Sequence, residues 1–279
     1  MGDIVIQLLP HILAAVGYAA LGFHFWDTRW RDKGREPPAG RMVLSERAVI
    51  GGIIGIHAVL LHQGIFSGGA MRFSFALALS LILWLAVLIY WLESFRSRMD
   101  GLQPMVLPLA AVASALPWFF PQTQVLAHAR STGFTLHFTA AMLAYSLFTL
   151  AALHAVFMSL AEAALHRHNL TRRLASLPPL LTMEALLFRI LHIGFGLLTL
   201  ALASGFLFSE ALFGKALTFS HKTVFAVLSW LIFATLLVGR HYWGWRGKKA
   251  LRWTLAGFLS LFFAYVGSRF VVEILLGRI

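Results

Sequence analysis

The chain has 279 residues, of which 59% are hydrophobic and only 12% are charged, and it contains no cysteine. A soluble globular domain carries charged side chains at about a quarter of its positions, so this composition excludes an ordinary soluble domain. The formal net charge of +12 could suit a nucleic-acid-binding protein, but apolar runs separate the cations and exclude one continuous basic face. Without cysteine, these residues supply neither a thiol relay nor a disulfide.

Eight apolar runs of membrane-spanning length follow one another along the chain. Such a run crosses the hydrocarbon region as a helix, because a helix pairs its own backbone amides there. The runs show no period-2 alternation, which excludes a membrane β-barrel. We therefore expect an all-α, polytopic helical bundle with about eight transmembrane helices that forms one integral membrane domain over residues 1–279. The expected spans are Ile4–Phe25, Ala48–Phe66, Phe73–Leu92, Met105–Phe120, Phe134–Leu160, Ala185–Phe208, Thr223–Val238 and Leu255–Leu275.

Lysine and arginine gather in alternate connections between these spans. Cytoplasmic loops of membrane proteins carry such an excess of basic residues. The pattern predicts a multi-pass membrane protein with both termini on the outer side, in the periplasm or its equivalent. The basic groups lie within residues 29–47, 96–98, 167–173 and 240–252.

The chain contains 12 histidines, which is unusual for a protein that lies mostly in lipid. Ionisable residues at membrane depth are costly and tend to face a cavity or a ligand, and neutral imidazole is an axial ligand of haem iron. Counting about 1.5 Å per residue places His57 near the midplane. Other histidines form two tiers, each of which could hold a planar metal ligand. The outer tier is His11, His62, His137 and His221, and the inner tier is His24, His154, His192 and His241.

A simpler interpretation applies to most of these histidines. A membrane histidine can hydrogen-bond a carbonyl on a neighbouring helix, and one near a border can reach water. His57 is far from either border, and His137 shares a helical face with Ala141 and Tyr145, so these two favour a ligand more strongly. The few acidic residues fall at span ends, which disfavours an ion channel or pump.

A series of short motifs occupies the second half of the chain in a fixed order. Together they resemble the cytochrome c assembly superfamily of haem-handling membrane proteins (CcsA, ResC and CcmC) over about residues 130 to 270, and look most like its YpjD-like inner-membrane branch. The motifs are Leu136-His137-Phe138, Leu143-Ala144-Tyr145, Leu177-Pro178-Pro179-Leu180 with Glu184, Gly194–Thr199 with Ser204-Gly205, Lys222 before the span with Trp230, and Gly244-Trp245-Arg246-Gly247.

The resemblance implies a multi-pass protein of the bacterial cytoplasmic (inner) membrane and non-covalent haem b with His137 as a periplasmic ligand. It also implies a tryptophan-rich loop ending in Trp-Asp-Pro-Lys-Glu, where this chain has Leu217–Thr223 without tryptophan. The family's second periplasmic histidine is expected within Ser268–Leu275, which contains Arg269 and Glu273 but no histidine. We therefore expect haem binding without a complete delivery motif. The candidate cofactor-binding residues are His137, His57, His221 and His62, with the iron held by His137 and either His57 or His221.

Two other functions stay open at this point. The chain could be an accessory or scaffold subunit of a membrane transport system for magnesium or cobalt that kept the fold without the haem. It could also be a b-type electron carrier. The expected partners are the lipid bilayer and either other cytochrome c maturation proteins or a membrane cation transporter, with no nucleic acid and no catalytic chemistry of its own.

Overall fold

The computed structural model describes residues 2–30, 42–66, 69–96, 101–126, 129, 131–166, 179–207 and 221–275. Within these ranges the chain is almost entirely helical, which confirms the expected all-α bundle. Short π-helical turns extend α1 (η1, Trp26–Trp30) and α9 (η4, Phe263–Gly267; η5, Val271–Leu275), with the three-residue α10 (Ser268–Phe270) between the last two. The long helices are α1 (Gly2–Phe25), α2 (Leu44–Ile65), α3 (Phe75–Glu93), α4 (Gln103–Phe119), α5 (Thr132–His166), α6 (Leu180–Leu207), α8 (His221–Trp243) and α9 (Gly247–Phe262).

Among the described residues, seven helical segments are long and apolar enough to cross a membrane. The fourth expected span is present as α4, but it has only 17 residues and contains Pro108 and Pro117 inside the helix. The sixth begins earlier than expected. Helix α6 starts at Leu180, directly after Pro179, whose carbonyl accepts the backbone N–H of Thr182 at 2.8 Å. The missing N–H of a proline costs nothing at the start of a helix, which explains this boundary.

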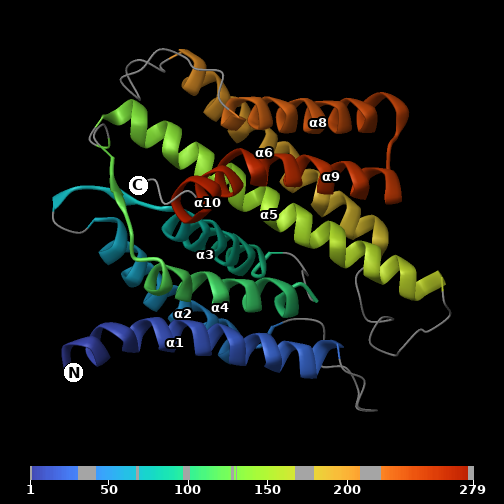
Figure 1. Ribbon diagram of the computed structural model, residues 1–279. Coiled ribbons are helices and arrows are strands. Elements are labelled where there is room, and N and C mark those ends of the chain that lie inside the picture. Colours follow the sequence, from blue (N-terminus) through green and yellow to red (C-terminus); the bar gives the residue numbers. More distant parts are fainter. Residues whose placement is uncertain are drawn as a thin grey trace.

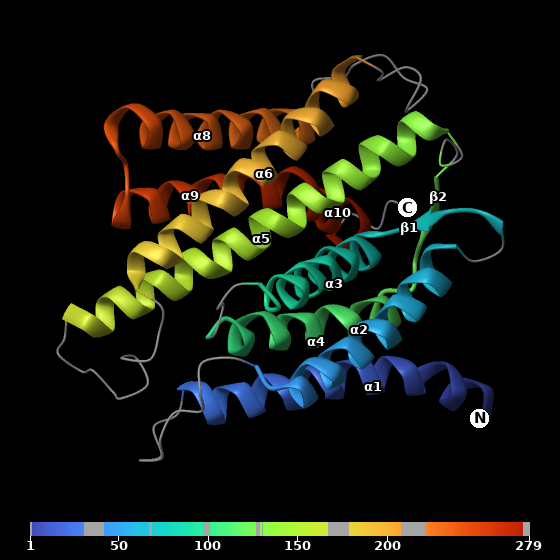
Figure 2. The ribbon, with the colours of Figure 1, turned by 180° about the vertical axis from the view of Figure 1, so that it is seen from behind.

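The helices form two groups that meet along α3 and α5. Helices α1 to α4 make one group, and α5, α6, α8 and α9 make the other (Figures 1 and 2). Helix α5 lies between them and is the most enclosed of the candidate spans, with 72% of its apolar window buried. It can pack on both groups because small residues such as Ala144, Ala151 and Ala155 line it and are fully buried.

A stack of side chains fixes the middle of the second group. The rings of Phe148 (α5) and Phe233 (α8) are parallel, with centroids 3.9 Å apart. Gly194 of α6 lies beside the Phe148 ring, and Gly257 of α9 lies beside the Phe233 ring. A hydrogen bond from Ser229 to the Gly257 carbonyl, at 2.9 Å, joins α8 to α9 at the same level. Four helices therefore meet through two rings and two glycines.

The start of α1 and the end of η5 lie at the same end of the bundle (Figure 1). We call this the outer end, and the opposite end, which carries the described basic connections, the inner end. The orientation in the membrane itself stays a prediction. At the outer end the strands β1 (Arg72–Phe73) and β2 (Gln124–Val125) pair antiparallel, with Phe73 opposite Gln124. This pair ties the connection between α2 and α3 to the segment between α4 and α5.

Candidate functional site

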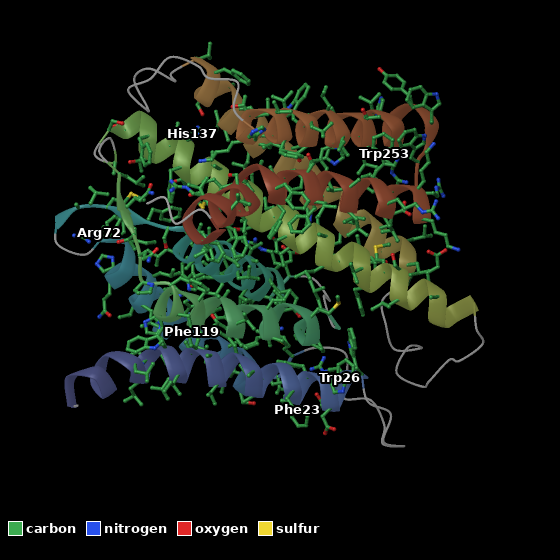
Figure 3. The ribbon with its side chains drawn as sticks, viewed as in Figure 1. Phe23, Trp26, Arg72, Phe119, His137 and Trp253 are labelled. Atoms are coloured by element: carbon green, nitrogen blue, oxygen red, sulfur yellow. The ribbon has the colours of Figure 1, made fainter. Side chains whose placement is uncertain are left out.

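His137 lies in the outer part of α5 and faces α6 (Figure 3). Its Nδ1 is 2.9 Å from the Oγ of Ser204. A Cβ atom added at Gly205 would lie 3.4 Å from the imidazole Cε1. The Ser204-Gly205 pair thus supplies a hydrogen-bond partner and the space for the ring. The structure brings together two motifs, separated by 67 positions, that carried the family resemblance.

The hydrogen bonds of Ser204 assign the tautomer of His137. The Ser204 hydroxyl donates to the carbonyl oxygens of Leu200, at 2.7 Å, and Ala201, at 3.1 Å. A hydroxyl has one proton, so Ser204 accepts from the Nδ1–H of His137. The neutral ring then carries its lone pair on Nε2. Metal-bound histidines commonly use this arrangement, in which one nitrogen donates to the protein and the other can bind the metal.

His57 occupies a different environment, as a fully enclosed residue of the first helix group. Its Nε2 is 2.8 Å from the Ser80 hydroxyl on α3, and its Nδ1 is 3.4 Å from the Tyr18 hydroxyl on α1. His57 and Tyr18 are 1% and 0% exposed, respectively. Because hydroxyl groups contact both ring nitrogens, ligation of a metal by His57 would break a buried hydrogen bond. This geometry supports a role in joining three helices.

The other two candidate ligands lie on the surface of the outer end. His62 is exposed near the end of α2, where its ring contacts Phe66 with centroids 5.3 Å apart. His221 is exposed and is the first residue of α8. The helix directions bring both toward the end where His137 lies (Figure 1). Across the described ranges, no group of three or more His, Asp or Glu side chains could hold a metal ion.

Most of the remaining tier histidines hydrogen-bond the protein, and two of them, His11 and His154, bond a carbonyl of another helix. His11 Nδ1 is 3.1 Å from the Ser114 carbonyl oxygen, and His154 Nε2 is 2.9 Å from that of Met183. His24 pairs with Glu46 at 3.1 Å. The His192 Nδ1 donates to the Phe188 carbonyl at 2.7 Å, within its own helix.

The family's second histidine was expected within Ser268–Leu275, and this segment makes a polar contact at the outer end through Arg269. There Arg269 donates from Nη1 to the Oε1 of Gln124, which belongs to β2, at 2.9 Å. Tyr265, one turn earlier, has its ring 6.0 Å from that of Tyr145 on α5. Tyr145 shares the helical face of His137, so the end of the last helix packs along the same side of α5. The altered loop from residue 217 to 220 lies outside the described residues.

A second site, at the inner end, joins the other motif residues. Glu184 of α6 is buried, and its Oε1 is 2.7 Å from the Nη1 of Arg240 on α8. Its Oε2 accepts the backbone N–H of Gly247, the first residue of α9, at 3.3 Å. Arg240 also donates to the Trp245 carbonyl at 3.2 Å, and its guanidinium lies 4.5 Å from the Phe188 ring centroid. One carboxylate therefore links three helices.

Trp245 closes the turn between α8 and α9 against Gly239. A Cβ atom added at Gly239 would lie 2.4 Å from the indole, a distance that no side chain can occupy without displacing the ring. The flanking Gly244 and Gly247 have φ angles of 62° and 56°, in the left-handed region that glycine adopts without strain. Sequence reasoning named Glu184 and the Gly244–Gly247 motif separately but missed their contact. The spacing alone carries no signal for it, since the two lie in different helices.

A known protein family matches the part of the chain that contains these motifs. Residues 54–276 match the family described as cytochrome C assembly protein. The chain belongs to this family. The match extends beyond the region of about residues 130 to 270 that the motifs cover, and takes in most of α2 together with α3 and α4.

Relatives of two kinds are similar to the chain. The inner membrane protein YpjD of Escherichia coli (strain K12) is 28% identical over 232 residues, 82% of this chain and 87% of YpjD. An uncharacterised 28.8 kDa protein from the nifR3-like 5' region of Azospirillum brasilense is 30% identical over 207 residues, 71% of this chain and 76% of that protein. The cytochrome c biogenesis protein CcsA of Chlamydomonas reinhardtii is 34% identical over 91 residues, 33% of this chain and 26% of CcsA. No solved structure matches.

The family motifs meet at two contact sites, and the two sites differ in their chemistry. The motif residues His137, Ser204 and Gly205 meet at the outer end, and Glu184 and Gly247 meet at the inner end. At the inner contact, Arg240 and the backbone N–H of Gly247 engage both oxygens of the buried Glu184 carboxylate, which indicates a role in holding the helices together. The outer contact leaves an imidazole in the tautomer that suits a metal. The outer site is therefore the candidate functional site.

Proposed function

We propose that this membrane protein of the cytochrome c assembly family binds haem b non-covalently at the outer end of α5 and α6, where His137 would hold the iron. The observation that carries the proposal is the hydrogen bond between His137 and Ser204, because it orients the ring and directs the lone pair to Nε2. The residues fit such a group in their donor chemistry: one neutral imidazole, a serine partner and a neighbouring glycine. When bound, haem supplies an iron centre that imidazole can ligate.

His221 is our choice for a second ligand. It is exposed at the first residue of α8, and α8 begins at the outer end, as α5 does. His57 is a poorer choice because Ser80 and Tyr18 already engage its ring. Imidazole ligands on an apolar bundle hold a cofactor and set access to it, while the chemistry belongs to the cofactor. We infer that the protein holds or passes haem and is no enzyme.

The relatives support this choice of cofactor. CcsA of Chlamydomonas reinhardtii is named as a cytochrome c biogenesis protein, and the stretch that aligns with it makes up 33% of this chain. On the strength of that name we infer a role beside other cytochrome c maturation proteins. The name of YpjD gives its location, the inner membrane. We infer the same membrane for this protein, with both termini periplasmic, and reporter fusions to the two ends would test the orientation.

A haem titration tests the proposed site. The protein is purified in mild detergent, haem is added to it, and the visible spectrum is recorded in the oxidised and reduced states. We expect a shifted Soret band for the unchanged protein. We expect His137→Ala to weaken haem binding by about tenfold or more, the range seen when a metal site loses part of its support. His192→Ala is the matched control, because His192 also donates from Nδ1 to the protein and lies in the same helix group.

The outcomes separate the proposed function from its alternatives. Failure of the unchanged protein to bind added haem would refute the proposal and favour the accessory subunit of a magnesium or cobalt transport system. Equal binding by the His137→Ala and His192→Ala variants would refute the site. Reversible reduction of the bound haem by a quinol would favour the b-type electron carrier, and the His221→Ala variant tests the second ligand in the same titration.

A further inference from the structure

The turn between α8 and α9 presents a group of exposed cations at the inner end. We call this group the basic corner. It occupies the first turns of α9 and the residue before it, and all four side chains are exposed. The members of the basic corner are Arg246, Lys248, Lys249 and Arg252.

Acidic side chains compensate little of this charge. Glu162 lies 3.8 Å from the Nζ of Lys248, which is beyond hydrogen-bond distance. Glu184 is engaged by Arg240 at 2.7 Å and by the Gly247 N–H. In the part of the chain that the structure describes, no carboxylate lies within ion-pair distance of Arg246, Lys249 or Arg252. The corner therefore carries a strong local positive charge.

The position of these cations at the start of a helix adds to the repulsion. Helix α9 begins at Gly247, and the N-terminal end of a helix carries partial positive charge. Lys249 and Arg252 are three positions apart and thus lie on the same helical face, where like charges repel. An anion that binds at this face would offset both the positive helix end and the repulsion between Lys249 and Arg252.

A tryptophan cluster lies directly beside the cations. Lys249 Nζ is 3.6 Å from the Trp245 ring centroid, which fixes the ammonium over the indole. Trp243 and Trp253 lie on either side of Trp245, with ring centroids 6.0 and 5.3 Å away. Figure 3 labels Trp253 at the end of the bundle where α8 meets α9. Tryptophans of membrane proteins gather at the depth of the lipid headgroups, so these rings indicate that depth.

From this geometry we propose that the basic corner binds the headgroup of an anionic phospholipid, with the phosphate contacting Lys249 and Arg252. The choice of a lipid over a free phosphate rests on the neighbouring surface. Tyr242 and Trp243, at the end of α8, are 74% and 68% exposed, so an apolar surface for acyl chains adjoins the cations. A headgroup phosphate at this depth neutralises the corner while its chains cover the aromatic rings. This site is separate from the proposed haem site, which lies at the other end of the bundle.

Lipid retention measured by native mass spectrometry tests the proposal. The full chain is transferred from nanodiscs of phosphatidylcholine alone, or from an equimolar mixture with phosphatidylglycerol, and the retained lipid is identified. We expect the unchanged protein to retain phosphatidylglycerol selectively. We expect the Lys249→Gln/Arg252→Gln variant to lose most of this selectivity, by about thirtyfold, because each cation near a membrane surface contributes roughly 1 kcal/mol.

A matched control removes the same net charge elsewhere. Arg72 and Arg96 are exposed cations outside the corner, and the Arg72→Gln/Arg96→Gln variant should retain phosphatidylglycerol as the unchanged protein does. Equal loss in the two double variants would refute a local site, because net charge alone would then explain retention. Unchanged selectivity in Lys249→Gln/Arg252→Gln would also overturn the proposal. Inorganic phosphate added to the mixture should not displace the lipid, and displacement would point to a free-anion site.

Discussion

One oxygen of the Glu184 carboxylate on α6 is 2.7 Å from the Nη1 of Arg240 on α8. The other oxygen accepts the backbone N–H of Gly247, the first residue of α9. This contact explains why Glu184 and Gly247, 63 positions apart, belong to one set of family motifs. It holds the inner end of the second helix group together. The haem-binding residue we propose lies at the opposite end, so damage to this contact should reduce stability first.

We therefore expect Glu184→Gln to destabilise the protein in detergent. Breaking a fully buried ion pair costs about 3–5 kcal/mol, and we expect about 2 kcal/mol here because water screens a partly exposed partner. Arg240 retains 31% of its side-chain exposure. Thermal unfolding of the purified protein measures the loss. Glu162→Gln is the control, since its 3.8 Å pair with Lys248 is at the surface and should contribute less than about 1 kcal/mol.

The buried polar group of His57, Ser80 and Tyr18 leads to a second prediction. Ser80→Ala leaves a ring nitrogen of His57 without its 2.8 Å partner, and an unsatisfied buried polar atom costs about 1–3 kcal/mol. We expect a lower unfolding temperature and unchanged haem binding. Ser159→Ala is the control, because Ser159 bonds only the Ala155 carbonyl of its own helix among its described contacts. Loss of haem in the Ser80 variant would contradict the structural role of His57.

Close packing at the turn between α8 and α9 gives a third prediction. Gly239→Ala would place a methyl group 2.4 Å from the Trp245 indole and force the turn apart. Overpacking of this kind costs about 1–3 kcal/mol. Gly52→Ala, on α2, is the matched control, because no atom lies within 4 Å of its added Cβ. Thermal unfolding should separate the two variants, and similar behaviour of both would show that the turn can adjust.

The fourth prediction concerns the residue that positions His137. Ser204→Ala removes the acceptor of the Nδ1–H bond while leaving the imidazole present, so it should weaken haem binding by about 10-fold through loss of ring orientation. A merely structural role would leave the spectrum of the bound haem unchanged. We expect a shifted Soret maximum in Ser204→Ala, and rescue by Ser204→Thr, which keeps the hydroxyl. Ser146→Ala, a buried serine that bonds its own helix at Met142, should retain the unchanged spectrum.

The sequence predicted the helices well because their signal is local. An apolar run long enough to span a bilayer is visible without knowledge of its neighbours, and seven of the eight expected runs meet that criterion in the structure. The position of His57 inside a helix was also predictable from counting residues, since α2 spans Leu44–Ile65. Its partners Tyr18 and Ser80 were not, because they belong to other helices.

The rotation of each helix about its axis limited the prediction of the site. In a soluble protein an apolar stripe marks the buried face, but lipid-facing and protein-facing positions of a membrane helix are both apolar. Helix α5 shows this directly: Leu136 is 62% exposed whereas Phe148 is fully buried, although both are apolar. The sequence therefore named His137 and Ser204 in separate motifs, and their contact required the packing of α5 on α6.

The shortness of α4 has a consequence for the surrounding lipid. With 17 residues it spans about 25 Å at 1.5 Å per residue, less than the roughly 30 Å of a typical hydrocarbon core. Leu109 and Val112 are exposed, so α4 presents an apolar face to lipid beside the longer α1. We expect the bilayer to thin locally along α4, because a hydrophobic span shorter than the hydrocarbon core is accommodated by thinning of the surrounding lipid. The protein would then favour membrane regions of short acyl chains.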